Sequence, residues 1–192
     1  MADGLEALDD VGLRAAVREQ LRQMRHGADA GSVTELVVDE ASTLDGIEQF
    51  PHIRQLGLEG TDVVDLRPLA GLRDLRELWL NDTRVADLGP LSALRALTIL
   101  ELGDTPVADI APLRSLGHLQ KLWLNGTSVT DLDPIRSLKA LVTVGVAGAP
   151  IEDYSPFEAL EGLQTLIVSR SASGRLGSLS SRTNLCIHFL DG

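Results

Sequence analysis

The chain has few of the residues that mark redox, secreted or membrane proteins. Cys186 is its one cysteine, so no internal disulfide can form, and a reducing compartment is favoured. No apolar run reaches the length of a membrane-spanning helix, and the acidic start MADGLEALDD does not resemble a basic-then-apolar leader. We therefore expect a cytoplasmic protein without membrane association.

Positive charge is also scarce. The chain has 17 lysines and arginines against 28 aspartates and glutamates, for a formal net charge of −11. Nucleic-acid binding depends on neutralising phosphates with Lys and Arg, so no nucleic-acid partner is expected. An acidic balance favours a basic partner protein, although acidity also serves solubility alone.

Motifs for catalysis and metal binding are missing as well. The sequence has no phosphate-cradling glycine loop, no nucleophile elbow and no paired zinc ligands. Its histidines lack metal-ligand spacing; they are His26, His52, His118 and His188. Cys186 lies in the apolar segment LCIHFL, which favours a small core residue over a nucleophile. We expect no catalytic residue, no cofactor and no metal.

What the chain does have is aliphatic residues repeated every 22 positions. One column runs Leu56, Leu78, Leu100, Leu122, Val144 and Leu166, and a second lies two residues further on in each unit. A spacing of two places both residues on one face of a strand. The pattern predicts parallel strands at 36–38, 56–58, 78–80, 100–102, 122–124, 144–146 and 166–168.

The rest of each unit changes spacing. Leu66, Leu69 and Leu72 are three residues apart, as on one side of a tight helical turn. Proline recurs where its fixed φ suits a first helical turn, at Pro68, Pro90, Pro112, Pro134 and Pro156. Each unit is thus a strand, a loop and a short helical return. One unit cannot bury its apolar side alone, but a stack of copies can.

The segments LWLNDTRVADLGPLSALRAL at 78–97 and LWLNGTSVTDLDPIRSLKAL at 122–141 resemble leucine-rich repeats. The likeness is to the 22-residue class of internalins and the phosphatase regulator SDS22, in its bacterial form. It covers residues 33–168. It implies an α/β fold: a right-handed leucine-rich repeat solenoid with a curved parallel sheet on the concave face and short helical or 3-10 turns on the convex face. The shared motif is scaffold and says little about function.

Two polar columns accompany the repeat. Thr61, Thr83, Thr105 and Thr127 stand where the family usually has Asn, and a short hydroxyl there can bond the neighbouring backbone. Asp65, Asp87, Asp109, Asp131 and Asp153 form the other column. Aspartate shortly before a helical proline is typical of a helix start, while side-by-side carboxylates are also compatible with calcium. We favour the helix start.

Both ends depart from the repeat. Residues 1–32 are predicted to form an N-terminal helical cap, with apolar residues at helical spacing over 4–26. The repeats, 33–168, begin with a shortened unit at 34–53. Residues 169–192 are predicted to form a basic, Ser/Gly-rich loop at 169–184 and a capping strand at 185–190. All three parts belong to one structural domain.

The only two tryptophans, Trp79 and Trp123, both lie in LWLN. Side chains alternate along a strand, so both indoles should point outward on the concave face. Strands lie ~4.8 Å apart, which places the indoles about 10 Å apart with Glu101 between them. The predicted partner-binding surface comprises Trp79, Trp123, Glu101, Glu77, Glu59, Ile99, Lys121, Asn81 and Asn125.

Exposed indoles among carboxylates are typical of a binding hot spot. LWLN is also a frequent consensus spelling, and aromatic residues stabilise sheets by cross-strand packing. We expect a non-enzymatic protein–protein interaction module, monomeric, that binds a basic protein as an inhibitor, immunity-type or regulatory subunit. The alternatives are a carbohydrate or small-ligand binding adhesion protein that uses the tryptophans as platforms, and a self-associating structural solenoid.

Overall fold

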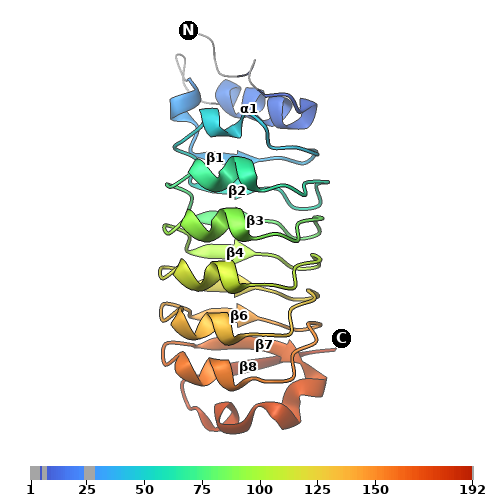
Figure 1. The fold of residues 1–192 in the computed structure, drawn as a ribbon, viewed down its shortest axis with the longest axis vertical. Helices are drawn as coiled ribbons and strands as arrows, with labels where there is room; N and C mark the ends of the chain where they lie inside the picture. Colours follow the sequence, from blue (N-terminus) through green and yellow to red (C-terminus); the bar gives the residue numbers. More distant parts are fainter. Residues whose placement is uncertain (1–4, 6–7, 24–28, 192) are drawn as a thin grey trace.

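The computed structural model describes residues 5, 8–23 and 29–191, which form a stack of similar coils (Figure 1). The strands of the described residues make one parallel sheet in chain order. They are β1 Glu35–Val37, β2 Gln55–Gly57, β3 Glu77–Trp79, β4 Ile99–Glu101, β5 Lys121–Trp123, β6 Thr143–Gly145, β7 Thr165–Ser169 and β8 Cys186–Leu190. The predicted parallel solenoid is confirmed.

The strands of the repeats begin one residue earlier than predicted. Leu56 is the middle residue of β2, and Leu58 follows the strand although its N–H still donates to the Trp79 carbonyl at 2.9 Å. The chain turns immediately after Leu58, because its carbonyl oxygen accepts a hydrogen bond from Thr61 Oγ1 at 2.7 Å. Both leucines of the pair are nevertheless fully buried.

Short 3-10 helices return the chain on the other side of the core (Figure 1). They are η2 Ala30–Ser32, η3 Ile47–Gln49, η4 Arg67–Gly71, η5 Gly89–Ala93, η6 Ala111–Ser115, η7 Asp133–Ser137, η8 Ser155–Ala159, η9 Arg170–Arg175 and η10 Gly177–Ser181. Proline lies in the first turn of η4 to η8, as the spacing predicts. The leucine columns fill the space between helices and strands, and no helix of the described residues is long and apolar enough to cross a membrane.

The threonine column has the structural role that its position predicts. Thr61, Thr83, Thr105 and Thr127 are all buried. In each, the hydroxyl donates to the carbonyl oxygen three residues earlier, at 2.6 to 2.8 Å. A buried carbonyl without a partner is costly, so these bonds keep the turn after each strand satisfied inside the stack.

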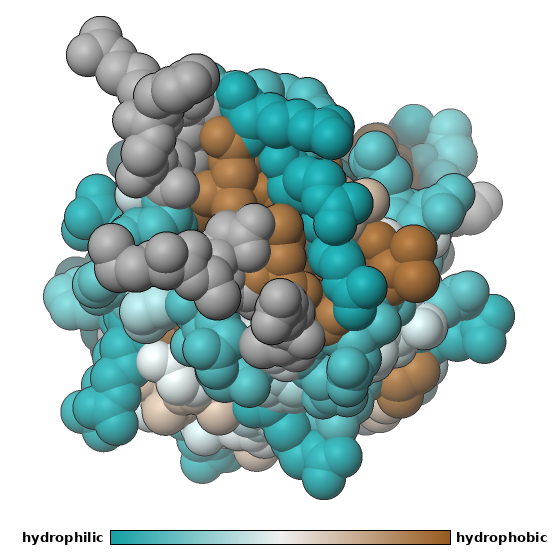
Figure 2. Space-filling view, turned by 90° about the horizontal axis from the view of Figure 1, so that it is seen from above, coloured by the Kyte–Doolittle hydropathy of each residue, from teal (hydrophilic) through white to brown (hydrophobic). Residues whose placement is uncertain are grey.

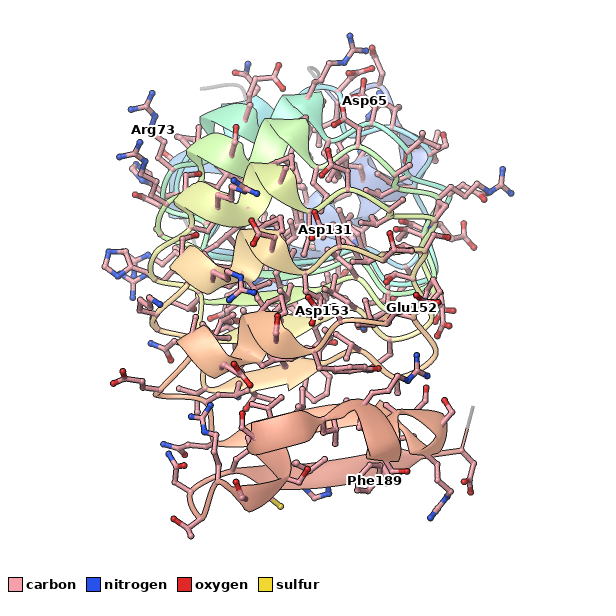
Figure 3. All side chains as sticks on the ribbon, turned by 60° about the horizontal axis from the view of Figure 1, so that its bottom comes forward. Asp65, Arg73, Asp131, Glu152, Asp153 and Phe189 are labelled. Atoms are coloured by element: carbon pink, nitrogen blue, oxygen red, sulfur yellow. The ribbon has the colours of Figure 1, made fainter. Side chains whose placement is uncertain are left out.

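The aspartate column starts the 3-10 helices. Each carboxylate accepts the backbone N–H two residues further on, at 2.8 to 2.9 Å. The side-chain hydrogen bond from Arg67 lowers the pKa of Asp65, and the backbone hydrogen bond from Ser155 lowers the pKa of Asp153. Figure 3 shows Asp131 and Asp153 on successive coils and Asp65 on an earlier one. The hydrogen bonds support the helix-start interpretation, because each carboxylate accepts a backbone N–H at the beginning of a 3-10 helix.

The N-terminal end of the stack is covered by helix α1, Val11–Gln23. It begins at Val11, later than the predicted helix over 4–26, of which residues 4, 6–7 and 24–26 lie outside the described part of the chain. Asp10 sets its start, because Oδ1 accepts the Leu13 N–H at 3.0 Å. Asp10 Oδ2 accepts the Ser42 N–H at 2.9 Å, so the same carboxylate also ties the helix to the first repeat.

The C-terminal end differs from the prediction in two ways. The segment expected to be a loop at 169–184 contains η9 and η10. Ala172, Leu176 and Leu179 are buried there, which is enough apolar spacing to close a final coil despite the serines and glycines. Cys186, predicted to be a core residue, is exposed. It pairs with Thr165 on the outer side of the sheet, so strand alternation directs it away from the core.

We expect Asp10→Ala to lower the free energy of unfolding at pH 7 by about 1 to 2 kcal/mol, the usual size of a lost N-cap. Burial raises the pKa of Asp10, but hydrogen bonds from Ser42, Leu13 and Thr43 outweigh it and lower the pKa. The contribution of Asp10 is therefore present above the ordinary aspartate pKa of about 3.9 and is lost as pH falls through the lower folded-state pKa.

Urea unfolding of wild type and variant from about pH 7 to pH 2 measures this, and the stability difference should shrink in acid. The exposed neighbour Asp9 provides the control variant Asp9→Ala, which should unfold like wild type. A difference that stays constant into acid would contradict the assignment.

Candidate functional site

The outward side chains of the sheet form what we call the strand face. It consists of the first and third residues of each strand from β1 to β8, together with the residue two positions after each of β1 to β6 and the fifth residue of β7 and β8. Its central column is confirmed by the strand register: Gly57 pairs with Trp79, Trp79 with Glu101, Glu101 with Trp123, and Trp123 with Gly145. Glu101 thus lies between the two tryptophans, as predicted.

Both tryptophans are half-buried, and so less open than the sequence predicts. The reason is visible at Trp123, whose ring lies close over the neighbouring strand. A Cβ atom added to Gly145 would come within 2.6 Å of Trp123 Cε3. Glycine at this position lets the indole rest on the sheet, a close approach that a glycine within a strand often marks. The indole is thereby held in place without being removed from the surface.

Asn81 holds the acidic residues around Trp79. Its Nδ2 donates to Glu59 Oε1 at 2.8 Å and to Glu101 Oε2 at 2.7 Å. Its Oδ1 accepts the N–H of Gly103, a buried residue, at 2.7 Å. The side chain therefore joins three successive coils. It fixes two carboxylates of the predicted surface in position.

Asn125 has a narrower role. Its Oδ1 accepts the N–H of Ala147 at 2.9 Å, which links β5 to β6. The predicted surface includes both asparagines, and the structure shows that each also serves the scaffold. The sequence did not predict two roles of glycine at this surface. The Gly103 N–H donates to Asn81 Oδ1, and Gly145 leaves room for the Trp123 ring. Glycine on a strand face among larger residues was the available signal.

The remaining predicted residues lie in the flanking column. Glu77 accepts a hydrogen bond from Gln55 Nε2 at 3.2 Å. Ile99 pairs with Glu77 on one side and with Lys121 on the other, so the strand register brings these three side chains together. Ile99 is half-buried and Lys121 is exposed. The structure thus gathers all nine predicted residues on strands β3 to β5 and in the turns that follow β2, β3 and β5.

Charge is unevenly distributed along the strand face. Its carboxylates all come from the coils of the first four strands, and they are Glu35, Asp39, Glu59, Glu77 and Glu101. Among the described residues of β5 to β8 the face has no carboxylate, and its ionisable side chains there include Lys121 and His188. The N-terminal half of the face is therefore acidic and the C-terminal half is not.

A groove of about 590 Å³ between α1 and β1 extends the acidic half. Glu19 from the helix and Glu35, Asp39 and Glu40 from the first coil line it, beside Val37, which is 69% exposed. Figure 2 looks onto this end of the molecule and shows hydrophobic surface next to hydrophilic residues. Sequence reasoning could not find the groove, because it exists only once α1 is docked on β1.

The stacked coils, the parallel sheet and the open strand face define a leucine-rich repeat solenoid fold. No protein-family model and no curated protein matches the sequence. Its fold is similar to solved internalin structures from Listeria monocytogenes. One internalin has 22% identity and a TM-score of 0.74 over 99% of this chain, and internalin C2 has 23% identity and a TM-score of 0.81 over 96%.

A leucine-rich repeat protein from Leptospira interrogans matches 83% of this chain with 19% identity and a TM-score of 0.65. At these identities the likeness is one of fold. The chain spans 65% of the first internalin, 85% of internalin C2 and 49% of the Leptospira protein.

We expect Asn81→Ala to lower the free energy of unfolding by about 1 to 3 kcal/mol, because it leaves the buried Gly103 N–H without its acceptor. Denaturant unfolding measures the loss. Gln55→Ala is the control, since Gln55 bonds only the half-buried carboxylate of Glu77 and its loss should cost little. Equal stability of Asn81→Ala and wild type would show that Asn81 does not join the coils.

Proposed function

We propose that this protein is a non-enzymatic binding module whose strand face, from β2 to β5, binds a basic partner protein. One observation carries the proposal. Two half-buried indoles, Trp79 and Trp123, flank the Glu101 carboxylate, and Asn81 holds that carboxylate in place. Tryptophan is enriched in protein-binding hot spots, and a fixed charge beside it adds specificity for a partner of opposite charge.

The apolar part of the interaction would come from the indoles and Ile99. Tryptophan is enriched in hot spots because it has a large contact area and few rotatable bonds. Contact with the sheet restricts Trp123 further, since its ring lies close over Gly145. Less conformational entropy is then lost on binding, which favours affinity.

The charged part would come from the acidic half of the face. The carboxylates on the first four coils, continued by the groove beside α1, favour a partner that is basic where it meets β1 to β4. The half from β5 onward, which has no carboxylate among the described residues, would meet a less basic part of the same partner. Long-range attraction of this kind mainly raises the association rate.

Inhibitor, immunity-type and regulatory-subunit roles all require this same surface, and within the proposal they differ only in what the bound partner does. A carbohydrate-binding role is the second candidate. It is favoured by the position of Trp79 and Trp123 in one column of the sheet, two strands apart, where both rings can serve as stacking platforms. Carboxylates that are already fixed by Asn81 favour the protein partner.

The test begins with capture from the native lysate. Wild type and a Trp79→Ala/Trp123→Ala double variant are used as baits, and proteins held only by wild type are identified by mass spectrometry. Calorimetry with the purified candidate should then show that Trp79→Ala binds about thirtyfold more weakly or worse, as expected for a lost anchor worth about 2 kcal/mol.

Arg95→Ala is the control for that experiment, because Arg95 is exposed and precedes β4 outside the strand face. Its affinity should equal that of wild type. If Arg95→Ala abolishes binding while Trp79→Ala does not, the partner uses a different face. Binding of a purified glycan that quenches tryptophan fluorescence, without any protein partner, would support the carbohydrate role instead.

Glu101→Gln isolates the charge contribution, because glutamine keeps an oxygen acceptor for Asn81 Nδ2. We expect about threefold to tenfold weaker binding at low salt and near-equal binding at about 0.5 M salt, where screening suppresses long-range attraction. Thermal unfolding should be unchanged. The same loss at both salt concentrations would mean that Glu101 makes a direct buried contact, and that charge attraction is not its main role.

A further inference from the structure

The two ends of the sheet are different. At the N-terminal end, β1 has three residues and α1 lies beside it (Figure 1). At the C-terminal end, β8 has five residues and is the last strand of the sheet. Proteins usually protect an edge strand with charge, proline, a bulge or a covering element. The strand β8, with the sequence CIHFL, contains neither a charged residue nor proline.

The backbone of β8 has hydrogen-bonding groups directed away from the sheet. Cys186 N–H donates to the Gln164 carbonyl of the preceding coil at 2.8 Å. Successive residues of a strand in this stack alternate between the preceding and the following neighbour, as Trp79 and Leu80 do. Ile187 and Phe189 therefore direct their N–H and carbonyl groups to the outer edge, where a further strand would pair.

The side chains of the same two residues are incompletely covered. Ile187 pairs with Leu166 and Phe189 with Val168, both fully buried core residues. Ile187 is half-buried, and Phe189 is 37% exposed because no further coil packs on it. Figure 3 shows Phe189 at this end of the stack. Within the described part of the chain, the core thus ends in an apolar surface next to backbone groups that no further strand pairs.

We propose that β8 pairs antiparallel with β8 of a second copy of this chain, with His188 opposite His188 on a two-fold axis. This register places Ile187 opposite Phe189 of the other copy, so all outward backbone groups of the strand find partners. The apolar side chains of the two residues cover each other, and no like charges face one another. The strand is complementary to itself, as a two-fold interface requires.

Pairing through β8 uses the C-terminal edge of the sheet, so it does not depend on a partner binding the strand face. It departs from the monomer that the sequence favours. The sequence predicts a capping strand at 185–190 but does not reveal that its core-facing residues stay uncovered.

The test uses the full chain in sedimentation velocity from about 10 µM to 1 mM, the range in which small interfaces associate. Wild type should form dimers with rising concentration. His188→Lys should weaken dimerisation at least about tenfold, because like charges directly opposite each other destabilise a strand pair. His118→Lys, the same change at an exposed residue away from β8, should dimerise like wild type.

Mixing His188→Lys with His188→Glu provides a test of the register. Opposite charges would then face each other, so the mixture should form a heterodimer more tightly than either variant forms a homodimer. His188 is exposed on the strand face, so neither change enters the core. In amide exchange followed by NMR, Ile187 and Phe189 should gain protection as wild-type concentration rises.

A wild type that stays monomeric over this range overturns the proposal. A mixture that dimerises no better than its components also overturns it, as does a His118→Lys variant as weak as His188→Lys. Protection of Ile187 and Phe189 that is independent of concentration would show that the chain covers its own edge. None of these outcomes bears on Trp79 or Trp123, so a failure here leaves the strand-face proposal to its own test.

Discussion

The whole architecture depends on the inability of one coil to bury its own apolar side. Each unit offers two leucines from the strand and several from the 3-10 helix, and they leave water only when the next coil presents the same side chains at the same height. A parallel sheet satisfies this constraint, because identical positions such as Leu78 and Leu100 then lie directly side by side. The aliphatic residues recur every 22 positions in the sequence because each coil must place them beside those of the next coil.

Stacking in register also decides where polar residues can go. A coil turns inside the stack, where water cannot reach its carbonyls, so the buried threonines donate to them. Asn81 applies the same principle on the open side, where it bonds a carboxylate of the preceding coil and both a carboxylate and the backbone of the following coil. The candidate site is therefore built partly from scaffold hydrogen bonds. This explains how acidic side chains on a flat surface can hold fixed positions.

A stack of repeats must end twice, and this chain ends in two different ways. The Asp10 carboxylate joins the start of α1 to Ser42, so the N-terminal coil is covered by an element that is fastened to it. At the other end, Arg182 donates to the Leu160 carbonyl at 2.8 Å and secures the last coil, but nothing lies beyond β8 in the described residues. Among the described residues, α1 thus covers the edge at β1, whereas the outer edge of β8 stays open.

The sequence by itself determined the repeat, the parallel order of the strands, the buried columns and the outward position of Trp79 and Trp123, because all of these follow from local periodicity. Only the tertiary structure decided features that depend on contacts between coils. These include the resting of Trp123 on Gly145, the three-coil bridge of Asn81 and the groove beside α1. Cys186 shows the limit most clearly. Its apolar neighbours predict burial, but burial requires both the inward side of the strand and a further coil, and Cys186 has neither.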